Sequence, residues 1–267
     1  MSTLFTSIAL FSILLPAAGR LMSRRVGGTR RWTNHRIWAP MTVSCVLASL
    51  VHLGWSTGEL PIATVSGGLQ AVALLISLAW IGLRRHERME AAGSILLALA
   101  AVLLAVSIVE PPGNSAPGVE SFFVALHLAL IFLGLGGYAV SFALSALFLI
   151  QRRRLKMKML DGIQDLPSLE TLDQFNVRTQ SFGFVSLTAG VAMGVMLAFE
   201  GGVSRAMTGP TVWGTGAVWV WYLVGLQTRL IGGWRGRTAA VFGVVGFGAI
   251  GLMIGLTVVV SGGWHAV

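Results

Sequence analysis

The feature that most constrains this chain is a series of eight apolar stretches. We place them at residues 3–22, 37–56, 65–83, 91–109, 120–150, 181–200, 212–231 and 238–260. A helix of about 20 apolar residues crosses a hydrocarbon core roughly 30 Å thick. The connections between the stretches are short, so little chain remains for a soluble domain. The sequence therefore predicts an all-α fold: a polytopic transmembrane helix bundle with eight spans, in which residues 1–267 form a single membrane domain.

The composition supports a lipid environment and argues against a nucleic-acid partner. Hydrophobic residues make up 55% of the chain and charged residues only 11%, whereas soluble domains carry about a quarter charged residues. The net charge is +9, but the arginines cluster at the ends of the apolar spans and form no aromatic-interleaved patch. The chain has a single cysteine, Cys45, which lies inside a span. One cysteine cannot form an intramolecular disulfide or a CxxC pair.

The distribution of basic residues predicts the orientation of the spans. If the spans alternate in direction, 18 of the 19 Lys and Arg residues lie on one side and only Arg205 on the other. Short loops rich in Lys and Arg stay in the cytoplasm. The first apolar run is followed by arginines rather than preceded by them, which favours a retained span over a signal peptide. We therefore expect a multi-pass protein of the cytoplasmic (inner) membrane with both termini outside.

Span five and the segment after it carry further information. Span five, at 120–150, is longer than a bilayer requires, so its last turns should project into the cytoplasm. In the next connection an apolar side chain recurs every third residue, at Leu166, Leu169, Leu172 and Phe175. This spacing predicts a short amphipathic helix over 166–178. It would lie at the membrane interface and hold spans five and six together, or it would form a docking surface for a soluble partner.

The polar residues inside the spans predict no catalytic site. Ser141, Ser145 and Thr188 are expected to bond to their own helix backbone. Asp and Glu are missing from the span centres, which weakens a proton-driven transporter. Glycines in spans six to eight, with those at 134, 136 and 137, predict close helix packing in lipid.

Three of the five histidines stand out because an ionisable group in or beside a span is costly and often functional. His35 and His86 lie among arginines in inner loops and are expected to be solvated. His52 ends span two, His127 begins span five and His265 follows span eight. With the predicted topology, all three approach the outer side of the membrane.

These histidines suggest a cofactor-binding site for haem. Imidazole is a common axial ligand of haem iron, and two histidines on opposite faces of one porphyrin form a bis-histidine site. His127 and His265, which the predicted topology puts at the same membrane depth, are the candidate axial metal ligands, with His52 approaching the same side, although no CxxCH or similar local signature accompanies them. Aromatic residues near this level could flank a porphyrin, or they could be an ordinary interfacial aromatic belt. They are Trp55, Phe122, Phe123, Trp213 and Trp264.

The second half of the chain carries an ordered set of motifs. They are LHLALIFLGLGGYAVSFALSALFLIQRRRLK at 126–156, LPSLETLD at 166–173, GFVSLTAGVAMGVMLA at 183–198, LQTRLIGGWRGRTAA at 226–240 and GGWH at 262–265. In their order they resemble the family of membrane cytochrome c assembly proteins that includes CcsA, ResC, HemX and YpjD. In CcsA-type members the resemblance implies presentation of haem at the outer face, where it is joined to apocytochrome c. His127 and His265 then correspond to the two external histidines that ligate haem iron.

Two departures from the family pattern refine this expectation. The segment 201–212 stands where the family has a tryptophan-rich loop and keeps only Pro210 of it, and Gln227 stands where CcsA-type members have an intramembrane histidine. The pattern therefore resembles a HemX-like or YpjD-like member. We expect a protein that binds or handles haem in c-type cytochrome assembly, beside other assembly proteins, without autonomous enzyme chemistry.

Two alternatives remain at this point. One is a HemX-type membrane regulator of tetrapyrrole biosynthesis that acts on a cytoplasmic enzyme, glutamyl-tRNA reductase, through the basic end of span five and the segment 166–178. The other is a small-molecule transporter or structural membrane protein with no haem, in which the outer histidines are incidental.

Overall fold

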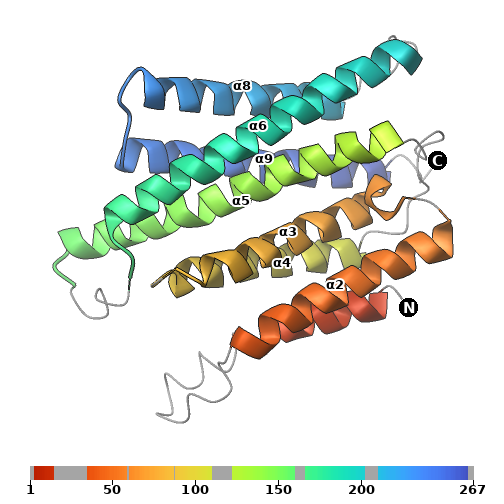
Figure 1. Cartoon of the computed structure of the whole chain (residues 1–267), viewed down its shortest axis with the longest axis horizontal. Coiled ribbons are helices and arrows are strands. Elements are labelled where there is room, and N and C mark those ends of the chain that lie inside the picture. The colour runs from red at the N-terminus through yellow and green to blue at the C-terminus, as the bar shows by residue number, and fades with distance from the viewer. Residues whose placement is uncertain are drawn as a thin grey trace. The chain divides into compact units, whose positions relative to one another are not determined.

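The computed structural model describes residues 3–14, 35–58, 60–86, 88–109, 122–159, 166–201 and 210–263. Within these ranges the regular structure is helical throughout, which confirms the predicted all-α class (Figure 1). The helices are Thr3–Leu14, α2 (His35–Thr57), α3 (Val65–Leu83), α4 (Glu90–Val109), α5 (Phe122–Lys156), α6 (Leu169–Gly201), α8 (Pro210–Leu230) and α9 (Arg237–Gly263), with a 3-10 turn, η1 (Pro61–Ala63). Each predicted span overlaps one of these α-helices.

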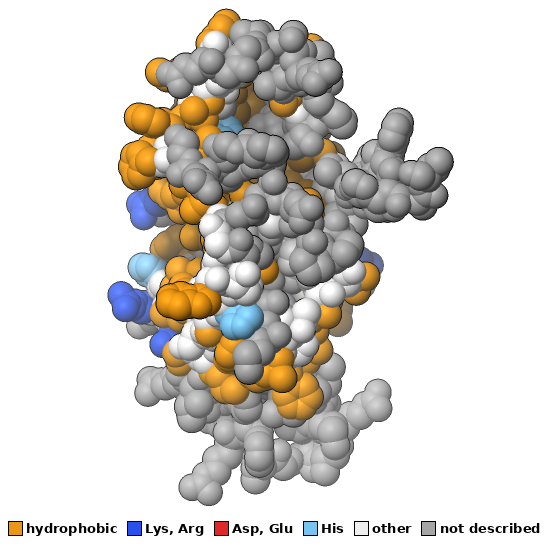
Figure 2. Space-filling model, turned by 90° about the vertical axis from the view of Figure 1, so that its right-hand side faces the viewer, with side chains coloured by type: hydrophobic (Ala, Val, Ile, Leu, Met, Phe, Trp, Pro, Cys, Tyr) orange, Lys and Arg blue, Asp and Glu red, His pale blue; other side chains and the backbone are white. Residues whose placement is uncertain are grey.

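Length and apolar composition mark the fold as a membrane helix bundle. Among the described residues, five helical segments are long and apolar enough to cross a bilayer: Val65–Leu83, Ala91–Val109, Phe122–Lys156, Leu169–Phe199 and Arg237–Gly255. The apolar helices Thr3–Leu14 and Pro40–Ser56 are shorter. Hydrophobic side chains predominate among the described residues on the face shown in Figure 2. Such a surface suits lipid rather than water. The orientation, with both termini outside, stays a prediction.

The helices form two compact units, residues 1–121 and 122–267, and the single domain over the whole chain stays a prediction. In the first unit, Trp80 of α3 is almost fully buried. A Cβ at Gly93 of α4 would lie 2.0 Å from its ring, so only glycine leaves room for the indole. Hydroxyl pairs join the first helix to α2: Thr6 to Ser49 at 2.9 Å, and Ser12 to Thr42 at 2.7 Å.

The second unit is built on α5 and α6, which lie side by side (Figure 1). With 35 and 33 residues, each is about 50 Å long and exceeds the membrane core. Helix α5 therefore continues beyond residue 150, as the long span predicted, and its projection into the cytoplasm stays a prediction. A Cβ added to Gly137 would lie 2.9 Å from Gly183 Cα, and one on Gly134 would lie 3.0 Å from Leu187 Cβ. The backbones of α5 and α6 therefore approach each other closely, as the glycines in the sequence led us to predict.

The prediction of a separate interfacial helix at 166–178 is wrong. Ser168 caps the start of α6, since its Oγ accepts a hydrogen bond from the Thr171 amide at 3.1 Å. From Leu169 the helix runs without a break into the predicted span. Leu172 is fully buried, and Gln151 of α5 donates to the Pro167 carbonyl at 2.8 Å. The apolar spacing therefore reflects packing within the second unit, where the start of α6 pairs with the extended end of α5.

A buried polar network joins α5 and α6 and corrects the expectation for two serines. Ser141 donates to Asn176 Oδ1 at 2.5 Å, and Asn176 Nδ2 donates to Ser145 Oγ at 3.0 Å. Ser141 and Ser145 thus bond across helices rather than to their own backbone. Thr188 does bond within its helix, to the Phe184 carbonyl at 2.7 Å, as predicted.

Replacing Asn176 with alanine is expected to lower the free energy of unfolding by about 1–3 kcal/mol, the usual cost of leaving buried polar groups without partners. Unfolding of the protein in detergent micelles with a chemical denaturant measures this change. Gln174→Ala is the matched control, because Gln174 is exposed on the same helix. Equal stability losses in the two variants would contradict a role for the network.

Candidate functional site

His127 lies in the second turn of α5 and is held by the backbone of α6. Its Nδ1 lies 2.8 Å from the carbonyl oxygen of Gly190. A carbonyl only accepts hydrogen bonds, so Nδ1 carries a proton, and in the neutral imidazole Nε2 then keeps its lone pair. No described residue forms a hydrogen bond with Nε2. The imidazole is therefore fixed in the tautomer that a metal ligand requires.

Gly194 makes room for this ring, and Gly190, one helical turn earlier, makes room for Ile131. A Cβ on Gly194 would lie 2.6 Å from His127 Cε1 and 3.0 Å from Nδ1. A Cβ on Gly190 would lie 2.9 Å from Ile131 Cδ1, on the next turn of α5. Positions 190 and 194 share one face of α6. Because this face lacks side chains, the imidazole lies directly against the helix backbone.

The fold brings the start of α5 and the end of α9 to the same end of the second unit (Figure 1). A Cβ on Gly243 would lie 2.8 Å from Ser145 Oγ, and the rings of Phe247 and Phe142 stack at 4.8 Å. These contacts fix an antiparallel register, which puts the last turn of α9 level with His127. His265 follows α9 by two residues and, like Trp264, lies outside the described residues. Its pairing with His127 stays a prediction.

His52 belongs to α2 in the first unit. Its ring centroid lies 6.1 Å from that of Phe5 at an interplanar angle of 53°. Its Nδ1 is buried without a hydrogen-bond partner among the described residues. Because the two histidines belong to different compact units, a site shared by His52 and His127 stays a prediction.

Four of the five aromatic residues predicted near the histidines lie within the described ranges, and their side chains are exposed. Trp55 is 89% exposed, Phe122 71%, Phe123 56% and Trp213 72%. This exposure fits the aromatic belt of a membrane interface and equally a surface that contacts a flat ligand. Gln227, at the position of the family's intramembrane histidine, is exposed on α8. Most of the segment that replaces the tryptophan-rich loop, residues 202–209, lies outside the described residues.

Within the described ranges, no group of three or more His, Cys, Asp or Glu side chains comes together in a way that could hold a metal ion. Haem iron needs only one or two axial ligands from the protein, because the porphyrin supplies the rest.

Sequence reasoning missed two buried features of the second unit. The chain's only two tyrosines, Tyr138 and Tyr222, stack at 3.5 Å with an interplanar angle of 6°. Arg229, one of the 18 basic residues predicted on one side of the membrane, is buried, and its Nη2 lies 2.7 Å from Asp173 Oδ2. Asp173 Oδ1 also accepts from the Gly236 amide at 3.2 Å. In the sequence, the stacked tyrosines are visible only as one tyrosine in each of two spans, and the buried ion pair only as an arginine at the end of a span.

Comparison with known proteins extends the resemblance to most of the chain. The chain is 26% identical over 227 residues to the cytochrome c biogenesis protein CcsA of Parasynechococcus marenigrum (strain WH8102), and the match covers 74% of each chain. It is 26% identical over 232 residues to the protein of the same name from Synechococcus sp. (strain CC9902), covering 74% of this chain and 75% of the relative. Residues 62–265 match the family described as cytochrome c assembly protein. The chain therefore belongs to the cytochrome c assembly protein family and is a multi-pass membrane protein of cytochrome c biogenesis.

Proposed function

We propose that the protein binds haem at the outer face of the cytoplasmic membrane, with His127 and His265 as axial ligands, and handles it for c-type cytochrome assembly. The hydrogen bond of 2.8 Å between His127 Nδ1 and the Gly190 carbonyl carries this proposal. Histidines that ligate metals almost always donate their other ring N–H to a carbonyl, a carboxylate or water. That donation fixes the ring and raises the basicity of Nε2.

The residues around His127 have distinct roles in this proposal. The Gly190 carbonyl orients the imidazole, and Gly194 leaves the space that the ring occupies. His265 would approach the opposite face of the porphyrin, because the chain leaves α9 at the level of His127. His52 would be a further outer-face contact, supported by its buried Nδ1 without a partner among the described residues. Bound haem would supply the iron porphyrin that c-type cytochromes carry.

The protein would act as an assembly factor, beside other cytochrome c assembly proteins, rather than as a complete synthetase. Gln227 and the segment 201–212 support this distinction, because both depart from the pattern of CcsA-type members. The outer orientation is supported by the 18 of 19 basic residues that alternating spans place on the opposite side.

Haem titration of the purified protein in detergent tests the proposal. Wild type should develop the Soret band of a low-spin bis-histidine haem, and His127→Ala and His265→Ala should lose that spectrum. His86→Ala is the control, since His86 lies between α3 and α4 at the end predicted to be cytoplasmic. If both outer substitutions leave the Soret band and the haem affinity unchanged, haem ligation by these histidines is wrong.

The regulatory alternative rests on a different observation. Arg152, Arg153, Arg154, Lys156 and Lys158 are all exposed at the end of α5. Such a surface suits an acidic cytoplasmic partner. Co-purification of glutamyl-tRNA reductase, weakened by neutralising residues 152–158, would support this function. Normal levels of c-type cytochromes after deletion of the gene would exclude the assembly function.

A further inference from the structure

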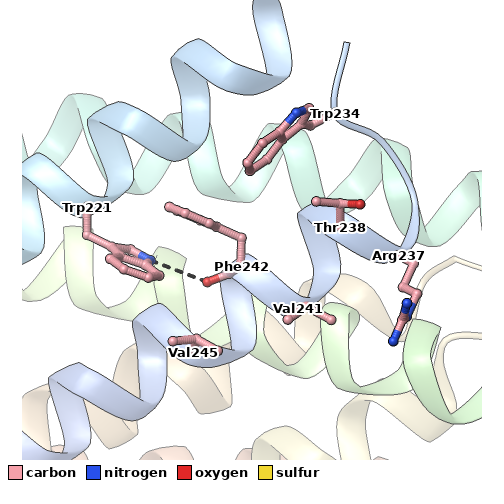
Figure 3. Close-up of a pocket in the computed structure, with 7 residues that line it drawn as sticks. All are labelled: Trp221, Trp234, Arg237, Thr238, Val241, Phe242 and Val245. Atoms are coloured by element: carbon pink, nitrogen blue, oxygen red, sulfur yellow. Dashed lines mark hydrogen bonds between the residues drawn. The ribbon is translucent and has the colours of Figure 1, made fainter. Parts of the chain in front are cut away.

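A groove between α8 and α9 lies apart from the histidines, at the arginine-rich end of the second unit. Its volume is about 350 Å³. Figure 3 shows Trp221 and Val245 at one end of the groove and Arg237, on the first turn of α9, at the other. The groove thus has an apolar part along the helices and a basic part at Arg237, where the chain enters the predicted span 238–260.

Three aromatic rings form a fixed wall of this groove. Trp221 and Phe242 stack at 4.3 Å, and Trp234 meets Phe242 edge-on at 6.4 Å (Figure 3). The Trp221 indole N–H donates to the Phe242 carbonyl at 3.3 Å. A Cβ on Gly246 would lie 2.4 Å from Trp221 Nε1, and one on Gly225 would lie 2.5 Å from Phe242 Cε1. The glycines therefore allow this interlocked stack.

The loop that carries Trp234 is anchored rather than loose. The Trp234 amide donates to the Thr228 carbonyl at 3.2 Å. Two residues later, the Gly236 amide donates to Asp173 Oδ1 at 3.2 Å, and the same carboxylate binds Arg229. The groove is therefore built by contacts that hold its wall in place.

Arg237 gives the groove a charge that the described residues do not neutralise. The salt bridge formed within the described ranges joins Arg229 to Asp173 and leaves Arg237 out. Arg237 is exposed, and Thr238, the next residue of α9, also lines the groove. A guanidinium and a hydroxyl can each donate a hydrogen bond to a phosphate oxygen. The complementary ligand therefore has an anionic head and an apolar tail.

We propose that this groove binds an anionic phospholipid. Its phosphate would pair with Arg237 and Thr238, and an acyl chain would lie along Trp221, Phe242 and Val245. The protein spans a membrane, so a molecule with these two parts is always present at high local concentration. Basic pockets between transmembrane helices bind anionic head groups, and indole rings favour the head-group level. The site does not depend on haem and is independent of the proposed function.

Tryptophan quenching by brominated lipids tests the proposal. The protein is titrated in detergent with phosphatidylglycerol or phosphatidylcholine that carries the same dibrominated acyl chains. Wild type should prefer phosphatidylglycerol by about fivefold, the contribution of one basic residue near an anionic lipid. Arg237→Gln should abolish the preference and Arg237→Lys should keep most of it. Arg235→Gln is the matched control, because Arg235 is exposed two residues away and does not line the groove.

The remaining outcomes separate other occupants from a lipid. Trp221 and Trp234 are replaced together by phenylalanine. The quenching by phosphatidylglycerol should then no longer exceed that by phosphatidylcholine, a result that would place the lipid in the groove. Equal binding of the two lipids by wild type, or an equal loss in Arg235→Gln and Arg237→Gln, would overturn the proposal. So would displacement of the brominated lipid by excess inorganic phosphate or by haem. Circular dichroism establishes that each variant keeps its helix content.

Discussion

Alanine in place of Gly194 is expected to weaken haem binding about 10- to 100-fold, the range seen when a group that orients a metal ligand is lost. The added Cβ would lie 2.6 Å from His127 Cε1. The ring must therefore turn away and give up its hydrogen bond of 2.8 Å to the Gly190 carbonyl. Haem titration followed at the Soret band measures the affinity.

The control separates this effect from the general effect of alanine in a helix. Alanine stabilises a helix interior by about 1 kcal/mol relative to glycine, so loss of haem affinity in Gly194→Ala would not reflect a weaker helix. Gly248→Ala in α9 makes the same change where a Cβ meets nothing within 4 Å, and its haem affinity should match that of wild type. If Gly194→Ala also binds haem like wild type, the cradle does not position His127.

The positions of the helices were predictable because the membrane imposes a length on each apolar run. The predicted residues 65–83 coincide with α3, whose start is capped by Thr64 Oγ1 at 3.0 Å from the Gly67 amide. At the other end of α3, the composition changes from the apolar Leu83 to the basic Arg84 and Arg85, so hydropathy locates the end of the helix. At α6 it does not. The helix begins 12 residues before the predicted span, since its first turns pack on α5 outside the apolar run.

The position of His127 along its helix was predictable, but the geometry around it was not. The order of the spans predicted His127 near the start of span five, and it lies in the second turn of α5, while the outer side of that end stays a prediction. The spacing of Gly190 and Gly194 in the sequence does not show that they lie next to His127, more than 60 positions earlier. Such a contact depends on the rotation of two helices about their axes, which 20-residue hydropathy does not determine.

Arg229 illustrates a different limit. A basic residue at a span end satisfies the charge rule whether it is solvated or buried, and its partner Asp173 is 56 residues away. The sequence therefore indicates on which side of the membrane Arg229 lies, but not whether its side chain is buried. The structure shows Arg229 of α8 paired with Asp173 of α6, and Asp173 also binds the loop before α9 through the Gly236 amide.

Replacing Arg229 with methionine is expected to lower the free energy of unfolding by about 3 kcal/mol, the lower end of the range for breaking a buried ion pair. The lower end applies because the Asp173 side chain keeps 20% of its surface exposed, against 6% for Arg229. Methionine roughly preserves the apolar stem, so the loss reflects the carboxylate left without its counter-charge. Denaturant unfolding in micelles, followed by circular dichroism, measures the difference.

The matched control is Arg235→Met, which removes an exposed arginine from the adjacent loop and should change stability by less than about 0.5 kcal/mol. Adding Asp173→Asn to Arg229→Met should recover part of the loss, because the uncompensated charge is then gone. If Arg229→Met costs no more than Arg235→Met, the ion pair does not support the second unit. Since Asp173 also holds the Gly236 amide at 3.2 Å, Arg229→Met should weaken the lipid preference at the groove as well, although Arg229 does not line it.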